Sequence, residues 1–116
     1  MKTLITRQLP LEVARHSEGI RTLCEKYHVR SLYIFGSATT SQFTPQSDID
    51  FLVEFGEIDP LDYFDNHMNF KEGLEALFSR EVDLLEVQTL KNPVLKQSVN
   101  RNKILVYGRE DTKMAL

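Results

Sequence analysis

Polar and hydrophobic residues alternate in one eight-residue stretch of the chain, DIDFLVEF at 48–55. Every second residue, from Ile49 to Phe55, is apolar, which is the period of a β-strand with one buried face. Three other short runs are rich in leucine, β-branched and aromatic residues, and these also predict strands. The four predicted strands are residues 31–35, 48–55, 80–87 and 103–108.

Three other segments carry apolar residues at steps of three and four, the spacing of a helix with one buried side. They are residues 11–29 after Pro10, residues 61–78, and residues 92–102. The inward side chains expected for the second of these helices are Leu61, Phe64, Met68, Leu74, Leu77 and Phe78. Helices and strands thus alternate along the chain, which predicts an α/β or α+β fold, a small mixed sheet with helices packed on one face.

Length and composition fit one small domain. The chain has 116 residues, 41% of them hydrophobic, so we expect a single domain over residues 1–116 with a core of its own. No stretch approaches the ~18 apolar residues of a membrane span, and the first residues make a poor signal peptide. Cys24 is the only cysteine, which excludes an internal disulfide and suits a buried core position. We therefore expect a cytoplasmic protein.

Charge is divided unevenly along the chain. Residues 48–86 hold 12 of the 17 acidic residues and two basic ones, whereas residues 88–113 hold six basic residues and two acidic ones. An acidic middle can hold metal cations and a basic end can meet phosphates or an acidic partner, although ordinary solvated surfaces give the same pattern. The net charge of −3 and the lack of interleaved basic and aromatic residues argue against direct nucleic-acid binding.

Two like charges stand at the start of the alternating strand. Asp48 and Asp50 are two residues apart, so their carboxylates point to the same side. A hard divalent cation such as Mg²⁺ removes the repulsion between them. Asp83 holds a similar place in the next predicted strand, and it faces the same site if the two strands are neighbours. Three such aspartates could hold two metal ions for a displacement at phosphorus.

A Gly-Ser pair ends the strand before these carboxylates. Gly36 would let a phosphate approach the backbone closely, and the Ser37 hydroxyl could bond a phosphate oxygen beside free N–H groups of the next turn. Taken singly, each feature has an ordinary reading: a surface Asp-x-Asp, a serine N-cap, and an acid at a strand end. Their combination in one order and spacing is far more specific.

The stretch GSATTSQFTPQSDID, at 36–50, resembles the signature of the minimal nucleotidyltransferases in the DNA polymerase beta superfamily. That signature is Gly-Ser, a gap of ten residues, and Asp-x-Asp; the resemblance runs from about residue 31 to 108. It implies a nucleotidyltransferase fold, two Mg²⁺ ions and ATP as substrate. By this resemblance Gly36 and Ser37 contact the triphosphate, and Asp48 and Asp50 bind both ions. Asp83 completes the site and orients or deprotonates the attacking hydroxyl.

The resemblance also implies a partner. Family members of this size are commonly antitoxins that pair with a HEPN-domain ribonuclease toxin and transfer AMP to a toxin tyrosine. Many of them carry an arginine and a glycine soon after Gly-Ser, whereas GSATTSQF has neither. This chain must then use another cation or bind nucleotide weakly, and Arg80, Lys91 and the bases near the C-terminus are possible substitutes.

Three hypotheses follow from these residues. In the first, the chain is a Mg²⁺-dependent enzyme that moves AMP from ATP to a hydroxyl of a toxin. In the second, it is a catalytically weak or inactive member of the fold that neutralises its partner by direct binding in a homo- or hetero-oligomer. In the third, AMP goes to a small molecule such as an aminoglycoside; the lack of room for a second, substrate-gripping domain counts against this.

Overall fold

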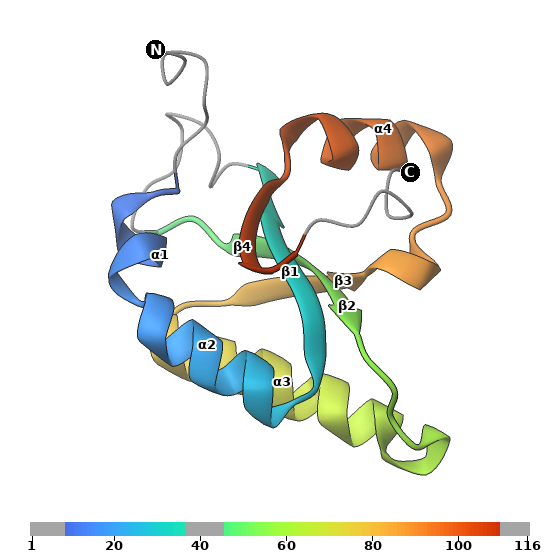
Figure 1. Ribbon diagram of the computed structural model, residues 1–116. Helices are drawn as coiled ribbons and strands as arrows, with labels where there is room; N and C mark the ends of the chain where they lie inside the picture. The colour runs from blue at the N-terminus through green and yellow to red at the C-terminus, as the bar shows by residue number, and fades with distance from the viewer. Residues whose placement is uncertain (1–8, 37–45, 110–116) are drawn as a thin grey trace.

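The computed structural model describes residues 9–36 and 46–109, in which four strands form one mixed sheet (Figure 1). The spatial order is β3-β2-β1-β4, so β4 lies at an edge. β1 pairs antiparallel with both β2 and β4, and β2 pairs parallel with β3. The strands are β1 (Val29–Phe35), β2 (Ile49–Phe55), β3 (Val82–Glu86) and β4 (Ile104–Gly108). All four predicted strands and the mixed sheet are confirmed.

The first predicted helix is in fact two, α1 (Leu11–Arg15) and α2 (Ser17–Lys26). The break lies at His16, whose ring Nδ1 is 2.8 Å from the Glu12 carbonyl oxygen. That carbonyl would otherwise accept the His16 backbone N–H, which instead donates to Val13 at 3.1 Å. A side chain that competes with the backbone is therefore what divides the helix.

The larger core lies between the sheet and the helices α1, α2 and α3 (Tyr63–Phe78) (Figure 1). The alternating apolar residues of β2 are all buried here, as their spacing predicted. Cys24 is 0% exposed in the same core, and burial, followed by the charge of Glu25, raises the pKa of its thiol to about 12. The cysteine is thus a core side chain held in its neutral form.

Two of the predicted inward residues are exposed. Leu61 is 90% exposed and Phe64 is 72% exposed. The reason is a 3-10 turn, η3 (Pro60–Asp62), which Asp59 caps by accepting from the Leu61 N–H. The regular helix starts only after it, and its buried side follows the four-residue steps of Phe70, Leu74 and Phe78. Leu61 and Phe64 fall off that side.

The start of α3 is tied to the end of β3 by a polar network. The Tyr63 hydroxyl donates to one oxygen of Glu86, and His67 Nδ1 lies 2.6 Å from the other. Gln88 completes the network by donating to the Tyr63 hydroxyl at 2.6 Å. Glu86 is only 9% exposed, so its charge is satisfied by these neighbours rather than by water.

The last helix, α4 (Pro93–Asn102), packs on the other face of the sheet (Figure 1). Val99 of α4 is buried with Tyr33 of β1, Leu52 of β2 and Leu90, which follows the second 3-10 turn, η4 (Val87–Thr89). The expectation that helices cover one face is therefore wrong for α4. The centre of the sheet is apolar on both sides, so both sides need cover. No helix in the described ranges is long and apolar enough to cross a membrane.

Candidate functional site

Asp50 and Asp83 are direct neighbours in the sheet. Helix α3 carries the chain back so that β3 runs parallel to β2, and the second residues of the two described strands meet, Asp50 beside Asp83. Parallel strands require such a crossover, which is why two acids separated by 33 positions in the sequence come together. The condition on which a shared site of Asp50 and Asp83 depended, that the two strands are neighbours, is therefore met.

Both side chains point to the sheet face that α4 covers. Their strand neighbours Phe51 and Leu84 lie in the larger core, and the alternation of the strands directs Asp50 and Asp83 to the opposite side. Asp48 stands two residues before Asp50, just ahead of β2. Asp50 is half-buried, whereas Asp48 and Asp83 are exposed, so the three carboxylates are reachable from solvent.

The carboxylates act on one another. The pKa of Asp50 is raised to about 6, first by burial, then by the charges of Asp83 and Asp48 and by a hydrogen bond with Asp83. A hydrogen bond between two carboxyl groups requires a proton on one of them. This end of the sheet therefore favours a bound positive charge, either a proton or a cation.

Gly36 ends β1 directly beside this site. Phe35 pairs with Asp50, and Gly36 follows with a φ of 75°. A Cβ built on Gly36 would lie 2.3 Å from Asp50 Oδ2, so a side chain here would displace the carboxylate. The glycine was predicted to admit a phosphate; the structure adds that it makes room for Asp50. Ser37, the other predicted nucleotide-binding residue, lies outside the described residues.

Arg80 fixes the entry to β2, which sequence reasoning did not foresee. Its guanidinium donates to the Ser47 carbonyl at 2.8 Å and to the Glu12 carboxylate at 2.5 Å. The Arg80 side chain is 10% exposed, so this ion pair is largely shielded from water. Ser47 directly precedes Asp48, and Arg80 thus holds the backbone that carries the first carboxylate. A possible phosphate-binding cation is instead engaged in a structural contact.

The donor set can be tested against a magnesium ion. Within residues 9–36 and 46–109, no three His, Cys, Asp or Glu side chains are already arranged to hold an ion. The oxygen ligands of Asp48, Asp50 and Asp83 are nevertheless of the kind that Mg²⁺ prefers. After burial, the charges of Asp83 and Asp48 are the next causes that raise the pKa of Asp50, and a cation would offset those charges. The residues fit a hard cation, which would offset the negative charge of this cluster as a proton does.

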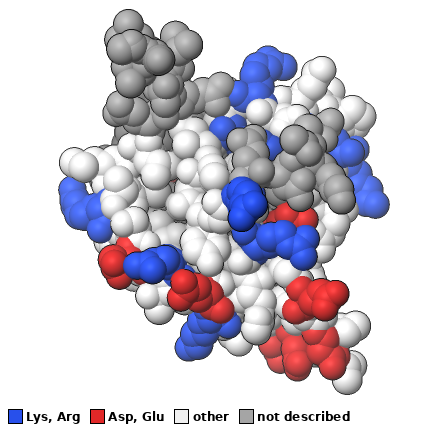
Figure 2. All heavy atoms as spheres, in the orientation of Figure 1, with Lys and Arg blue, Asp and Glu red and all other residues white. Residues whose placement is uncertain are grey.

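Acidic and basic side chains are unevenly distributed over the surface as well as along the chain. Figure 2 shows acidic side chains gathered at the lower right, where Figure 1 places the turn between β2 and α3. The exposed acids of this turn and the first turn of α3 are Glu57, Asp59, Asp62 and Asp65. Basic side chains lie around α4, and others lie at the left and lower left, where Figure 1 places α1 and α2.

The sequence and the fold match known proteins. Residues 18–112 match the family model described as polymerase beta, nucleotidyltransferase. Protein adenylyltransferase MntA of Thermococcus cleftensis is 32% identical over 96 residues, which cover 83% of this chain and 91% of that protein. A candidate protein adenylyltransferase of Methanocaldococcus jannaschii is 35% identical over 95 residues, 82% of this chain and 92% of that one.

A solved structure shares the fold. The crystal structure of a toxin-antitoxin with AMP-PNP superposes with a TM-score of 0.66 at 22% identity, over 85% of this chain and 80% of that one. The family model spans most of the chain, and the fold brings Asp50 and Asp83 together next to Gly36. The chain therefore belongs to the polymerase beta family and is a nucleotidyltransferase.

Proposed function

We propose that this chain is an antitoxin that transfers AMP from ATP to a hydroxyl group of a partner toxin in the cytoplasm. The observation that carries the proposal is the pairing of Asp50 with Asp83, next to Asp48, on an accessible sheet end. The relatives named as protein adenylyltransferases support a protein acceptor, and the likeness to a toxin-antitoxin structure supports the kind of partner.

In this proposal the three carboxylates have different tasks. Asp48 and Asp50 hold two Mg²⁺ ions, and Asp83 completes the site and accepts the proton of the attacking hydroxyl. When bound, the ions supply positive charge to the phosphate oxygens. Gly36 leaves room for Asp50 to take up this position, and Gly36 and Ser37 bind the triphosphate from the end of β1.

The reaction is a displacement at the α-phosphorus of ATP. The acceptor oxygen bonds to that phosphorus, and the bond from phosphorus to the oxygen bridging to the β-phosphate breaks. The leaving pyrophosphate keeps the electron pair, and the hydroxyl proton passes through Asp83 to water. The acceptor we propose is a tyrosine of a HEPN-domain toxin, whose phenolic oxygen is a sufficient nucleophile once its proton is withdrawn.

Label transfer from ATP tests the proposal. The purified chain is incubated with α-labelled ATP, Mg²⁺ and its partner toxin, beside the Asp48→Asn/Asp50→Asn variant. We expect label on the toxin with the wild type alone, and mass spectrometry to find it on a tyrosine. Equal labelling by the variant would show that these carboxylates do not carry the reaction. An unlabelled toxin that still co-purifies with the wild type would instead establish neutralisation by direct binding.

A further inference from the structure

Two large apolar side chains lie exposed on the acidic turn, residues 57–65 between β2 and the first turn of α3. Leu61 is 90% exposed and Phe64 is 72% exposed. The exposed acids that accompany them in this short segment are Glu57, Asp59, Asp62 and Asp65. Neighbouring apolar side chains with a polar rim are typical of a docking surface, whereas single exposed ones are not.

The acids of this turn have little use within the fold. Among the described parts of the chain, none of them forms an ion pair. Asp59 accepts from the Leu61 N–H at 2.9 Å, but Asp62, at the N-cap of α3, accepts no hydrogen bond from the helix. Negative charge near a helix N-terminus is favourable, which accounts for the acids but not for the exposed leucine and phenylalanine among them.

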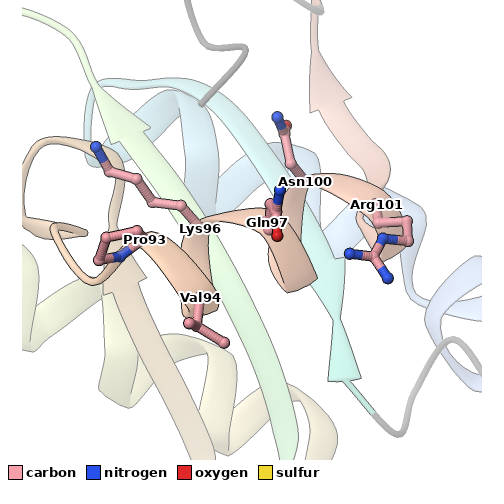
Figure 3. A pocket seen from close by; sticks show the side chains of 6 residues that line it. All are labelled: Pro93, Val94, Lys96, Gln97, Asn100 and Arg101. Carbon is pink, nitrogen blue, oxygen red and sulfur yellow. The ribbon is translucent and has the colours of Figure 1, made fainter.

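The start of α4 has exposed apolar side chains and the opposite charge. Val94 is 77% exposed and Leu95 is 40% exposed. They belong to a surface with a hollow of about 560 Å³, where Figure 3 shows Val94 on one side of the helix and Lys96 on the other. Lys91, just before the helix, is exposed, and neither lysine forms an ion pair with a described residue. This surface is therefore complementary to the acidic turn in charge and similar to it in apolar character.

Both surfaces lie at the end of the sheet away from the carboxylates. Because β2 and β3 are parallel, the acidic turn after β2 and the segment from η4 to the start of α4 after β3 leave the sheet at the same end. Figure 1 shows them on one flank, with α4 above and the acidic turn below. Asp50 and Asp83 pair at the opposite end of these strands, so a partner on this flank leaves them accessible.

We propose that the chain forms a two-fold dimer in which the acidic turn of each copy docks on the start of α4 of the other. Leu61 and Phe64 enter the hollow on α4, and Asp62 pairs with Lys96. The occupant is a second copy because one chain carries both the acidic surface and its basic counterpart on the same flank. A two-fold axis between them forms the contact twice, which doubles the buried area and closes the assembly at two copies.

Sedimentation velocity over a range of concentrations measures dimerisation of the purified full chain. We expect a reversible dimer for the wild type and dimerisation about tenfold weaker in Leu61→Ser/Phe64→Ser, because the apolar side chains at the centre of the contact are lost. Both side chains are exposed, so the melting temperature should stay close to that of the wild type. Leu11→Ser is the matched control, since Leu11 is 73% exposed on α1 and should leave the dimer unchanged.

Charge reversal tests the proposed pairing itself. Asp62→Lys and Lys96→Glu should each weaken the dimer about tenfold, because the contact occurs twice and becomes repulsive in both places. The two changes together should restore most of the affinity, since the ion pair forms again with its signs exchanged. Glu72→Lys makes the same change of charge at an exposed position further along α3 and should have no effect.

Three outcomes would overturn the dimer. They are a wild type that stays monomeric at every concentration, a dimer that Leu61→Ser/Phe64→Ser leaves as tight as before, and a combined charge variant that regains no affinity. A monomeric wild type whose binding to the partner toxin is lost in Leu61→Ser/Phe64→Ser would assign the acidic turn to that partner instead. The proposed AMP transfer is decided separately, because Asp48→Asn/Asp50→Asn changes the other end of the sheet and should dimerise like the wild type.

Discussion

The two ends of the β2–β3 pair each carry acidic side chains, but in opposite surroundings. At the end of β3, Glu86 is buried between the Tyr63 hydroxyl and His67, and Val53 of β2 is its strand partner. At the start of the same strands, Asp50 meets Asp83 and Asp48, and its pKa is raised to about 6, first by burial and then by the charges of these two neighbours. Glu86 has a tyrosine hydroxyl and an imidazole as its partners, whereas the neighbours of Asp50 are other carboxyl groups.

This contrast distinguishes an acid that stabilises the fold from the acids that we propose to be functional. Burial and the hydrogen bond to Glu86 raise the pKa of Tyr63 to about 12, so the tyrosine keeps its proton and its role as donor. Like charges placed side by side, in contrast, do not stabilise the folded state. We therefore expect the ligand to bind at the end of the sheet that carries Asp50 and Asp83, and each variant below changes one end and leaves the other intact.

The largest effect is expected from Asp48→Asn/Asp50→Asn. AMP transfer should fall to background, since both ligands common to the two proposed ions lose their charge. The melting temperature should stay level or rise by a few degrees, because like-charge repulsion is removed. Calorimetry and label transfer on the same preparation check this. If the variant lost activity only because it unfolded, Asp48 and Asp50 would stabilise the fold as Glu86 does. The proposed difference between the two ends of the sheet would then not hold.

Gly36→Ala should damage both activity and stability. The residue needs a φ of 75°, and its Cβ would lie 2.3 Å from Asp50 Oδ2. The left-handed conformation alone costs about 1–2 kcal/mol for alanine, and the clash with the carboxylate adds to it. Chemical denaturation measures the stability, and KM and kcat measure the site. An unchanged kcat would mean that Asp50 need not occupy its present position.

Glu86→Ala should lower stability and spare the chemistry. The variant leaves the Tyr63 hydroxyl and His67 without their shared acceptor, at a cost of about 1–3 kcal/mol in the free energy of unfolding. Urea denaturation gives that value, and label transfer per folded molecule should stay within about twofold of wild type, a change of roughly 0.4 kcal/mol in the barrier. If fully folded Glu86→Ala lost AMP transfer, Glu86 would itself have a role in the reaction, contrary to the structural role assigned to it.

A smaller effect concerns pH and magnesium. The pKa of Asp50 rises from 3.8 to about 6 on folding, so the native state binds the extra proton between those values. The contribution of this group to stability is therefore present at low pH and is lost as pH rises toward 6. Mg²⁺ should replace the proton, so it should raise the melting temperature at pH 8 and much less at pH 5. Asp50→Asn should abolish the difference, whereas Glu86→Gln should retain it.

The strands and the carboxylates were predictable because their signals are local. A period of two residues fixes which side chains of β2 are buried, and it also places Asp48 and Asp50 on one side. The position of Asp83 beside Asp50, on the same side of the sheet, follows once β3 is taken as the neighbour of β2. The part played by Ser37 stays a prediction.

Other features depend on contacts that no local pattern encodes. Arg80 and Glu12 are 68 positions apart, so their ion pair could not be read from spacing. The 3-10 turn before α3 shifted the helical phase and exposed Leu61 and Phe64. The amphipathic pattern of α4 predicts a buried side at Val99 but not which face of the sheet it covers.

The most direct test of this account compares the two ends of the sheet in one assay. Asp50→Asn and Glu86→Gln each neutralise one acid of the same strand pair, and both are assayed for transfer of labelled AMP to the partner toxin. The account predicts that Asp50→Asn loses transfer while Glu86→Gln, corrected for the folded fraction, keeps it. Transfer that survives in Asp50→Asn would contradict the assignment of this carboxylate cluster as the active site.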